Sequence, residues 1–148
     1  MALIDLVTEE VVKVPITSRA KSDVIRELTE ILHTAGKIEE IEKVYDALMK
    51  RESIGSTGLE NGIAVPHAKT DEVKKLTLAI GIAPEGIDFA ALDGKPSTLF
   101  FLMLAPPDQS GPHIEALAEI ARATQSQAFC RALAASKNPA EVVELFRE

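Results

Sequence analysis

The chain has 148 residues, 46% of them hydrophobic and 26% charged, and this balance predicts a single globular domain rather than a disordered or fibrous protein. Its 16 basic and 23 acidic residues give a formal net charge of -7, and no Lys/Arg cluster is interleaved with aromatic residues, which argues against a nucleic-acid partner. The single cysteine, Cys130, excludes an internal disulfide and any paired-cysteine metal or redox motif.

The N-terminal residues of the sequence are not expected to be a targeting signal. The segment MALIDLVTEEVV has neither the basic start nor the long apolar core of a signal peptide. No apolar stretch approaches the roughly 20 residues that a membrane-spanning helix needs. We therefore expect a cytoplasmic chain that folds as one domain over residues 1–148.

Two short strands and two helices are predicted for the first half of the chain. The segments IDLV and VVKVPI are each rich in β-forming residues and are separated by the polar residues 8–10. A helix follows from about Ser18, a good N-cap residue, to Gly36, a residue type that commonly ends helices. A second helix covers residues 38–51 and carries apolar residues at helical spacing.

The second half of the chain predicts strands first and helices afterwards. Strands are expected at residues 63–65, 76–82 and 98–104, a helix at 110–122, and one or two further helices within 125–135 and 139–146. The stretch TLFFLML at 98–104 is apolar on both faces, which is typical of a central strand. Together these elements predict an α/β fold, a single domain with a mixed β-sheet of about five strands flanked by helices.

Widespread catalytic motifs are absent from the sequence. The GSTG at 55–58 is neither a nucleophile elbow nor a dinucleotide-binding turn. Gly94-Lys95 is followed by Pro96 rather than by the Ser or Thr of a P-loop. A hydrolase that uses a pair of histidines is therefore the weakest interpretation of this chain.

The candidate ligands of a metal ion have no recognised spacing. His33, His67, His113 and Cys130 form no HxxxH or CxxC motif, so neither a metal nor another cofactor is expected. Cys130 lies on an amphipathic stretch and is interpreted as a small buried hydrophobe. His33 lies near the end of a predicted helix, where a surface imidazole is mildly favourable and needs no further role.

His67 and His113 lie in settings that suit a phosphate group. His67 follows Pro66 at the end of a predicted strand, and loops beyond strand ends in α/β sheets commonly bind ligands. His113 is predicted at the second position of a helix, where free backbone N–H groups and the helix dipole attract anions. If the fold brings the two together, a neutral His67 could act as nucleophile while His113 receives the anion. Otherwise they are two unrelated histidines, and sequence separation does not decide between these alternatives.

Two segments resemble a known family. RESIGSTGLENGIAVPHAKT, residues 51–70, is similar to the active-site segment of the mannitol/fructose-type enzyme IIA of the bacterial phosphoenolpyruvate-dependent sugar phosphotransferase system (PTS). APPDQSGPHIEALAEIARA resembles the helix that carries the second histidine of that family. The resemblance covers essentially the whole chain, so residues 1–148 are expected to form one EIIA type-2 domain, a phosphotransferase component.

The resemblance implies roles for individual residues. His67 falls on the histidine that accepts a phosphoryl group from phospho-HPr, usually through Nε2, and passes it to a cysteine or histidine of a IIB partner. His113 falls on the histidine that positions the phosphoryl group without keeping it. Arg51 matches an arginine that can pair with phosphate oxygens, although it could equally cap its own helix. Ser56 and Thr57 could donate hydroxyls to phosphate or shape the turn, and the turn is the favoured interpretation.

One residue departs from the family pattern. Glu60 stands where many relatives have glycine. An acidic side chain close to the acceptor could repel phosphate or orient His67, and the sequence does not decide which.

Two functions follow from the resemblance. The first is a IIA subunit that takes phosphate from phospho-HPr and gives it to a IIB partner during uptake of a fructose- or mannitol-like sugar. The second is a nitrogen-regulatory type of IIA protein, which uses the same histidine but binds transporters or kinases according to its phosphorylation state. Either protein would meet a membrane only through its partners.

Overall fold

Two long antiparallel strands, β4 (Thr77–Ile87) and β5 (Ser97–Ala105), form the centre of the sheet in the computed structural model, which describes residues 3–147. The short strand β1 (Val12–Lys13) pairs parallel with β4. On the other side, β2 (Ile63–Ala64) and β3 (His67–Lys69) both pair parallel with β5. The result is the expected mixed sheet of five strands, in the order β1-β4-β5-β2 with β3 also beside β5.

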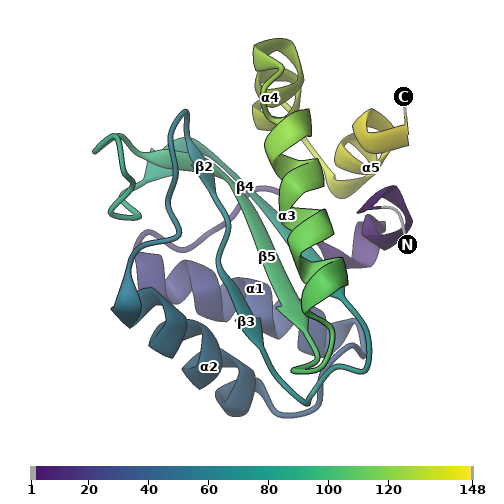
Figure 1. Cartoon of the computed structure of the whole chain (residues 1–148). Helices are drawn as coiled ribbons and strands as arrows, with labels where there is room; N and C mark the ends of the chain where they lie inside the picture. The colour runs from purple at the N-terminus through teal and green to yellow at the C-terminus, as the bar shows by residue number, and fades with distance from the viewer. Residues whose placement is uncertain (1–2, 148) are drawn as a thin grey trace.

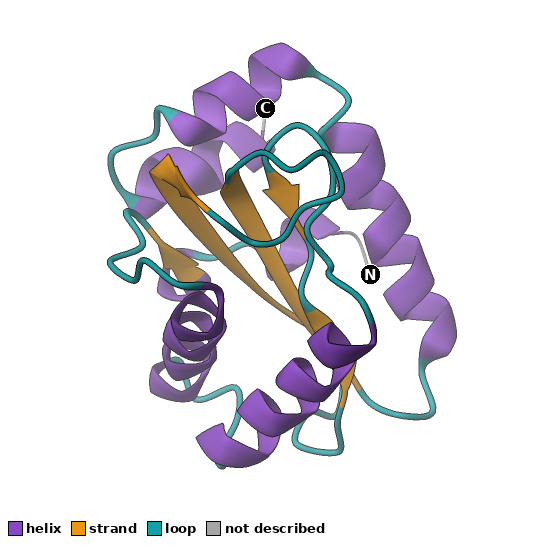
Figure 2. Cartoon of the chain, turned by 90° about the vertical axis from the view of Figure 1, so that its left-hand side faces the viewer, coloured by secondary structure: helices purple, strands orange, loops and turns teal. Residues whose placement is uncertain are grey.

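Helices cover both faces of this sheet. α1 (Lys21–Thr34) and α2 (Ile41–Ile54) lie on one face, and α3 (Ser110–Ala123), α4 (Gln127–Ala134) and α5 (Pro139–Arg147) on the other (Figure 1). Figure 2 shows the strands between the helical layers from a second direction. None of the described helices is long and apolar enough to cross a membrane.

β5 confirms the prediction of a central strand. Successive side chains of a strand point to opposite faces, so an apolar run supplies two cores at once. The even-numbered side chains of β5 pack towards α1 and α2; they are Phe100, Leu102 and Leu104. The odd-numbered side chains pack towards the helices on the other face; they are Leu99, Phe101 and Met103.

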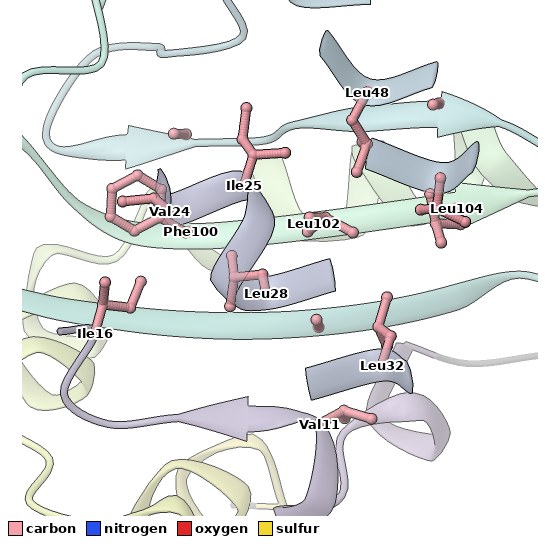
Figure 3. Packing of buried hydrophobic residues seen from close by; sticks show 14 of the residues in the cluster. Val11, Ile16, Val24, Ile25, Leu28, Leu32, Leu48, Phe100, Leu102 and Leu104 are labelled. Carbon is pink, nitrogen blue, oxygen red and sulfur yellow. The ribbon is translucent and has the colours of Figure 1, made fainter. Parts of the chain in front are cut away.

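α1 packs on the sheet through one apolar stripe, as its sequence spacing predicts. Figure 3 shows the stripe lying over β4 and β5, and its side chains are fully buried; they are Val24, Ile25, Leu28 and Leu32. The contact is close at Gly81 of β4, where an added Cβ would lie 2.4 Å from Cδ1 of Ile16 and 3.0 Å from Cδ2 of Leu28. Burial of each such leucine stabilises the fold by about 1.5–3 kcal/mol.

The N-terminal segment differs from the prediction. IDLV was expected to be a strand, but residues Leu3–Leu6 form a 3-10 turn and residues Glu9–Val11 a second one. Only two residues, Val12 and Lys13, pair with β4. The first turn instead packs near α3, and the Leu3 N–H donates a hydrogen bond to the Glu119 carboxylate at 3.1 Å. Tertiary contacts therefore override the local β propensity here.

Helix boundaries also shift. α1 begins three residues after Ser18, because the Ser18 hydroxyl donates to the Glu27 carboxylate at 2.6 Å instead of capping the helix. α2 continues beyond Arg51 to Ile54, and α3 begins at Ser110, so His113 is its fourth residue rather than the second. The strand β3 was not predicted, since it is only three residues long and depends on pairing with distant β5.

Candidate functional site

His67 is held in a defined orientation at the start of β3. His67 pairs with Met103 of β5 in the sheet. The Met103 N–H donates a hydrogen bond at 2.9 Å to the carbonyl of Pro66, the residue before His67. The Nδ1 atom of the half-buried ring lies 2.7 Å from the Val65 carbonyl oxygen. Because a carbonyl oxygen can only accept, Nδ1 must carry the hydrogen. In the neutral ring Nε2 therefore keeps its lone pair, as a nucleophilic nitrogen requires.

His113 reaches the same place from α3. The two imidazole rings have centroids 5.2 Å apart and an interplanar angle of 81°, an edge-to-face contact. His113 is only 6% exposed, and its Nε2 is buried without a hydrogen-bond partner in residues 3–147. Burial lowers the pKa of His113, and charge at His67 and Lys69 lowers it further. Burial is thus the largest cause of the lowered pKa of His113.

The lowered pKa of His113 gives a testable pH dependence of stability. Unfolded His113 binds a proton below its ordinary pKa of about 6.5, but the native ring resists that proton, so acid favours the unfolded state. We expect the free energy of unfolding to fall as the pH drops from about 7.5 to about 5.5. Urea unfolding of the wild type and of His113→Gln at both pH values measures this, and the variant should lose less stability. An equal loss in both proteins would contradict the shift.

A cleft with a volume of about 720 Å³ is lined by residues of α2, β3 and α3. Basic side chains come from the end of α2 and from β3, and no acidic residue is among those that line it. The lining residues are Ala47, Lys50, Arg51, Ile54, His67, Ala68, Lys69, Ser110, His113, Ile114 and Leu117. This chain with a net charge of -7 therefore has a locally basic cleft beside its two histidines.

Arg51 fits both of its predicted roles in geometry. Its Nη1 donates to the Gly55 carbonyl at 2.8 Å and so closes the C-terminal end of α2. The same side chain lines the cleft that contains His67 and His113. Since a guanidinium has five N–H donors, the helix cap leaves others for an anion in the cleft.

Ser56 and Thr57 do not line that cleft. Thr57 is 2% exposed, and its hydroxyl donates to the carboxylate of Glu52. The Ser56 hydroxyl donates to the Phe89 carbonyl at 2.8 Å. Of the predicted site residues, the fold brings together His67, His113 and Arg51, while Ser56 and Thr57 have internal partners that shape the loop.

Glu60 lies outside the cleft as well. It lines a neighbouring groove of about 440 Å³, together with Leu59 and Leu92. Glu60 does not line the histidine cleft, so it is not placed to repel a phosphate bound there by direct contact. It does not orient His67 either, because the Nδ1 atom of that ring pairs with the Val65 carbonyl.

Lys69 is a cleft residue that the sequence interpretation missed. Its Nζ donates to the Ser110 hydroxyl at 2.7 Å, and its charge contributes to the lowered pKa of His113. Residues two apart on a strand share a face, so Lys69 points to the same side as His67. The alternation would have revealed it if β3 had been predicted.

Among residues 3–147, no three His, Cys, Asp or Glu side chains gather as a metal site would require.

The comparison with protein families agrees with this arrangement. The model for "Phosphoenolpyruvate-dependent sugar phosphotransferase system, EIIA 2" matches residues 5–148. The chain belongs to this family. It is 31% identical over 148 residues to the fructose-specific EIIABC component of the PTS from Bacillus subtilis (strain 168). That match covers 100% of this chain but 23% of the relative, so the chain spans about a quarter of that protein's length.

Two solved structures share the fold. The crystal structure of the nitrogen regulatory protein IIA-Ntr from Neisseria meningitidis superposes with a TM-score of 0.89 at 27% identity, covering 97% of this chain and 98% of that one. The IIA component in the complex of enzyme IIA mannitol with phosphorylated enzyme IIB mannitol from Escherichia coli gives a TM-score of 0.80 at 25% identity, with 95% and 96% covered. The fold of this chain is thus similar both to a nitrogen regulatory IIA protein and to an enzyme IIA mannitol.

Cys130 lies away from the cleft, in α4. Its half-buried Sγ donates to the Thr124 carbonyl at 3.3 Å, and burial raises the pKa of the thiol, which keeps it protonated. We expect Cys130→Ala to accept a phosphoryl group at the wild-type rate. Labelling by phospho-HPr measures this, and a slow variant with an unchanged circular dichroism spectrum would contradict a structural role.

Proposed function

We propose that this EIIA protein is a phosphocarrier in which Nε2 of His67 accepts a phosphoryl group from phospho-HPr and passes it to a IIB partner. The observation that carries the proposal is the His67 ring itself. Its Nδ1 is occupied by the Val65 carbonyl, and its other edge shares a basic cleft with His113. Family membership supports the same chemistry.

The transfer balances without a metal or a proton donor. The N–P bond of the HPr phosphohistidine breaks as a new N–P bond forms at Nε2 of His67, and the HPr nitrogen recovers its lone pair. In the second transfer the Nε2–P bond of His67 breaks as a bond forms to a cysteine thiolate sulfur or to a histidine nitrogen of IIB, and Nε2 recovers its lone pair. Phosphoryl transfer passes through a loose transition state, so it depends mainly on alignment and on positive charge near the phosphoryl oxygens.

The cleft residues divide this work. We assign His113 to positioning the phosphoryl group, because its buried and neutral ring can donate a hydrogen bond to a phosphoryl oxygen. Arg51 pairs with the same oxygens through the N–H groups that its helix cap does not use. Ser56 and Thr57 act on the shape of the loop and not on phosphate.

Apolar side chains at the edge of the cleft suit a protein partner. Ile54 and Ile114 line the cleft and are 79% and 66% exposed. The docking of IIA mannitol from Escherichia coli with its IIB supports a IIB partner for this chain. We place the protein in the cytoplasm with its phospho-HPr donor, as one domain over residues 1–148, with membrane contact only through partners.

A regulatory function is the second candidate, and the similarity to IIA-Ntr favours it. Such a protein would accept the phosphoryl group on the same His67 but bind a transporter or kinase in one phosphorylation state. The candidates differ in what removes the phosphoryl group, not in what supplies it.

The test is incubation with phosphoenolpyruvate, enzyme I and HPr. We expect an acid-labile, base-stable phosphoryl group that mass spectrometry maps to His67. Addition of a fructose- or mannitol-type IIB then separates the candidates, because transfer of the label supports sugar transport, while a retained label supports regulation. Absence of a label from His67 in the folded protein would contradict both.

A further inference from the structure

Glu52 of α2 is the one buried carboxylate among residues 3–147, with 8% of its surface exposed. A buried charge is unfavourable unless it is paired and hydrogen-bonded. The Glu52 carboxylate accepts from Lys21 Nζ at 2.7 Å, from the Thr57 N–H at 3.1 Å and from the Thr57 hydroxyl. Glu52 does not line the histidine cleft, so it does not touch a bound phosphoryl group.

A continuous set of hydrogen bonds leads from this carboxylate to the acceptor histidine. The Thr57 carbonyl accepts from the Val65 N–H at 3.0 Å. The Val65 carbonyl in turn lies 2.7 Å from Nδ1 of His67. Glu52 fixes Thr57, Thr57 fixes Val65, and Val65 fixes the imidazole.

The loop between these residues packs closely against residues 89–91 at Gly58. A Cβ at Gly58 would lie 2.9 Å from Cα of Ala91 and 3.0 Å from the Phe89 carbonyl oxygen. Lys21 holds the other side, since its Nζ lies 4.7 Å from the centroid of the Phe89 ring and donates to the Ser56 hydroxyl at 3.3 Å. The position of Thr57 therefore depends on the Glu52 network from one side and on close packing from the other.

We propose that Glu52 is a positioning residue for the transfer reaction, because it holds the Thr57–Val65 backbone so that His67 keeps its hydrogen on Nδ1 and presents Nε2. This role deepens the proposed phosphocarrier function and rests on it. A glutamine at this position has one acceptor oxygen and an NH₂ group that only donates. At least one of the three donors around Glu52 would then lose its acceptor, and Thr57 would move.

The tautomer of His67 tests the proposal directly. ¹⁵N NMR of the wild type at about pH 8 should show Nδ1 protonated and Nε2 unprotonated. Glu52→Gln should show a mixture of the two tautomers and accept the phosphoryl group from HPr about tenfold or more slowly, since misplacement of a reacting atom by about 1 Å can slow a reaction 100-fold.

Glu27→Gln is the matched control. The Glu27 carboxylate also accepts from a threonine, Thr17, and from the N–H and hydroxyl of Ser18, but on a loop that does not line the cleft. This variant should lose stability without a change in the His67 tautomer or the transfer rate. Thr57→Ser should behave as wild type because it keeps the hydroxyl, whereas Thr57→Val should resemble Glu52→Gln.

The outcomes separate the two proposals. A folded Glu52→Gln protein with the wild-type tautomer and rate would overturn the positioning role. If Glu52→Gln does not fold, a folded Thr57→Val protein with the wild-type tautomer and rate would overturn the positioning role. The wild type could fail to accept a phosphoryl group from HPr while Glu52→Gln still changes the His67 tautomer. That result would support the positioning network and contradict the phosphocarrier function.

Discussion

Replacement of His67 with alanine or glutamine should abolish stable phosphoryl acceptance. The reason is geometric, because among the histidines only His67 combines an Nδ1 fixed by a backbone carbonyl with an open basic cleft. His113 is buried, and its lowered pKa and position on α3 suit a donor rather than an exposed nucleophile. Labelling from phosphoenolpyruvate through enzyme I and HPr, followed by mass spectrometry of the peptides, measures the loss.

His33→Ala is the control for this result. His33 lies exposed near the end of α1, outside the cleft, so its removal should leave labelling unchanged. Circular dichroism establishes that each variant is folded. A His67→Gln protein that still carries a stable phosphoryl group, on whichever residue, would disprove the assignment of the acceptor.

Local patterns predicted the elements that build the core. The stripe of α1 and the two-sided apolar run of β5 appear in the sequence as spacings of 3.6 and 2, and both pack as those spacings require. The sequence setting of His67, behind Pro66 and beyond a short strand, likewise marked it before its partner in space was known. Burial patterns of this kind are local, so a single sequence is enough to show them.

The remaining features depend on contacts between distant segments. β3 forms because residues 67–69 reach the edge of β5, more than thirty residues later in the chain. Glu52 looks like one more acidic residue on a helix until the fold buries it beneath Thr57. The hydroxyl of Thr57 is similarly indistinguishable in sequence from one that could bind phosphate. Pairing, burial and hydrogen-bond direction at these positions are tertiary properties, which local propensity does not encode.

The largest rate effect short of complete loss is expected at His113. We expect His113→Ala to slow phosphorylation by HPr and onward transfer by about tenfold to a thousandfold, the typical effect of losing one positioned donor to a developing anion. The acceptor should remain His67, because the ring that His67 presents is fixed by Val65 and not by His113. Rapid-quench measurements of labelling in both directions give the two rates.

His113→Gln separates the chemical effect of this substitution from its effect on packing. The glutamine amide can donate one hydrogen bond and fills more of the buried site than alanine does, so it should recover part of the rate. Alanine also leaves a cavity beside His67, and thermal unfolding of both variants shows how much stability that cavity removes. If His113→Ala transfers at the wild-type rate in both directions, the edge-to-face contact at 5.2 Å is a packing contact, and Arg51 with the other polar side chains of the cleft must hold the phosphoryl oxygens.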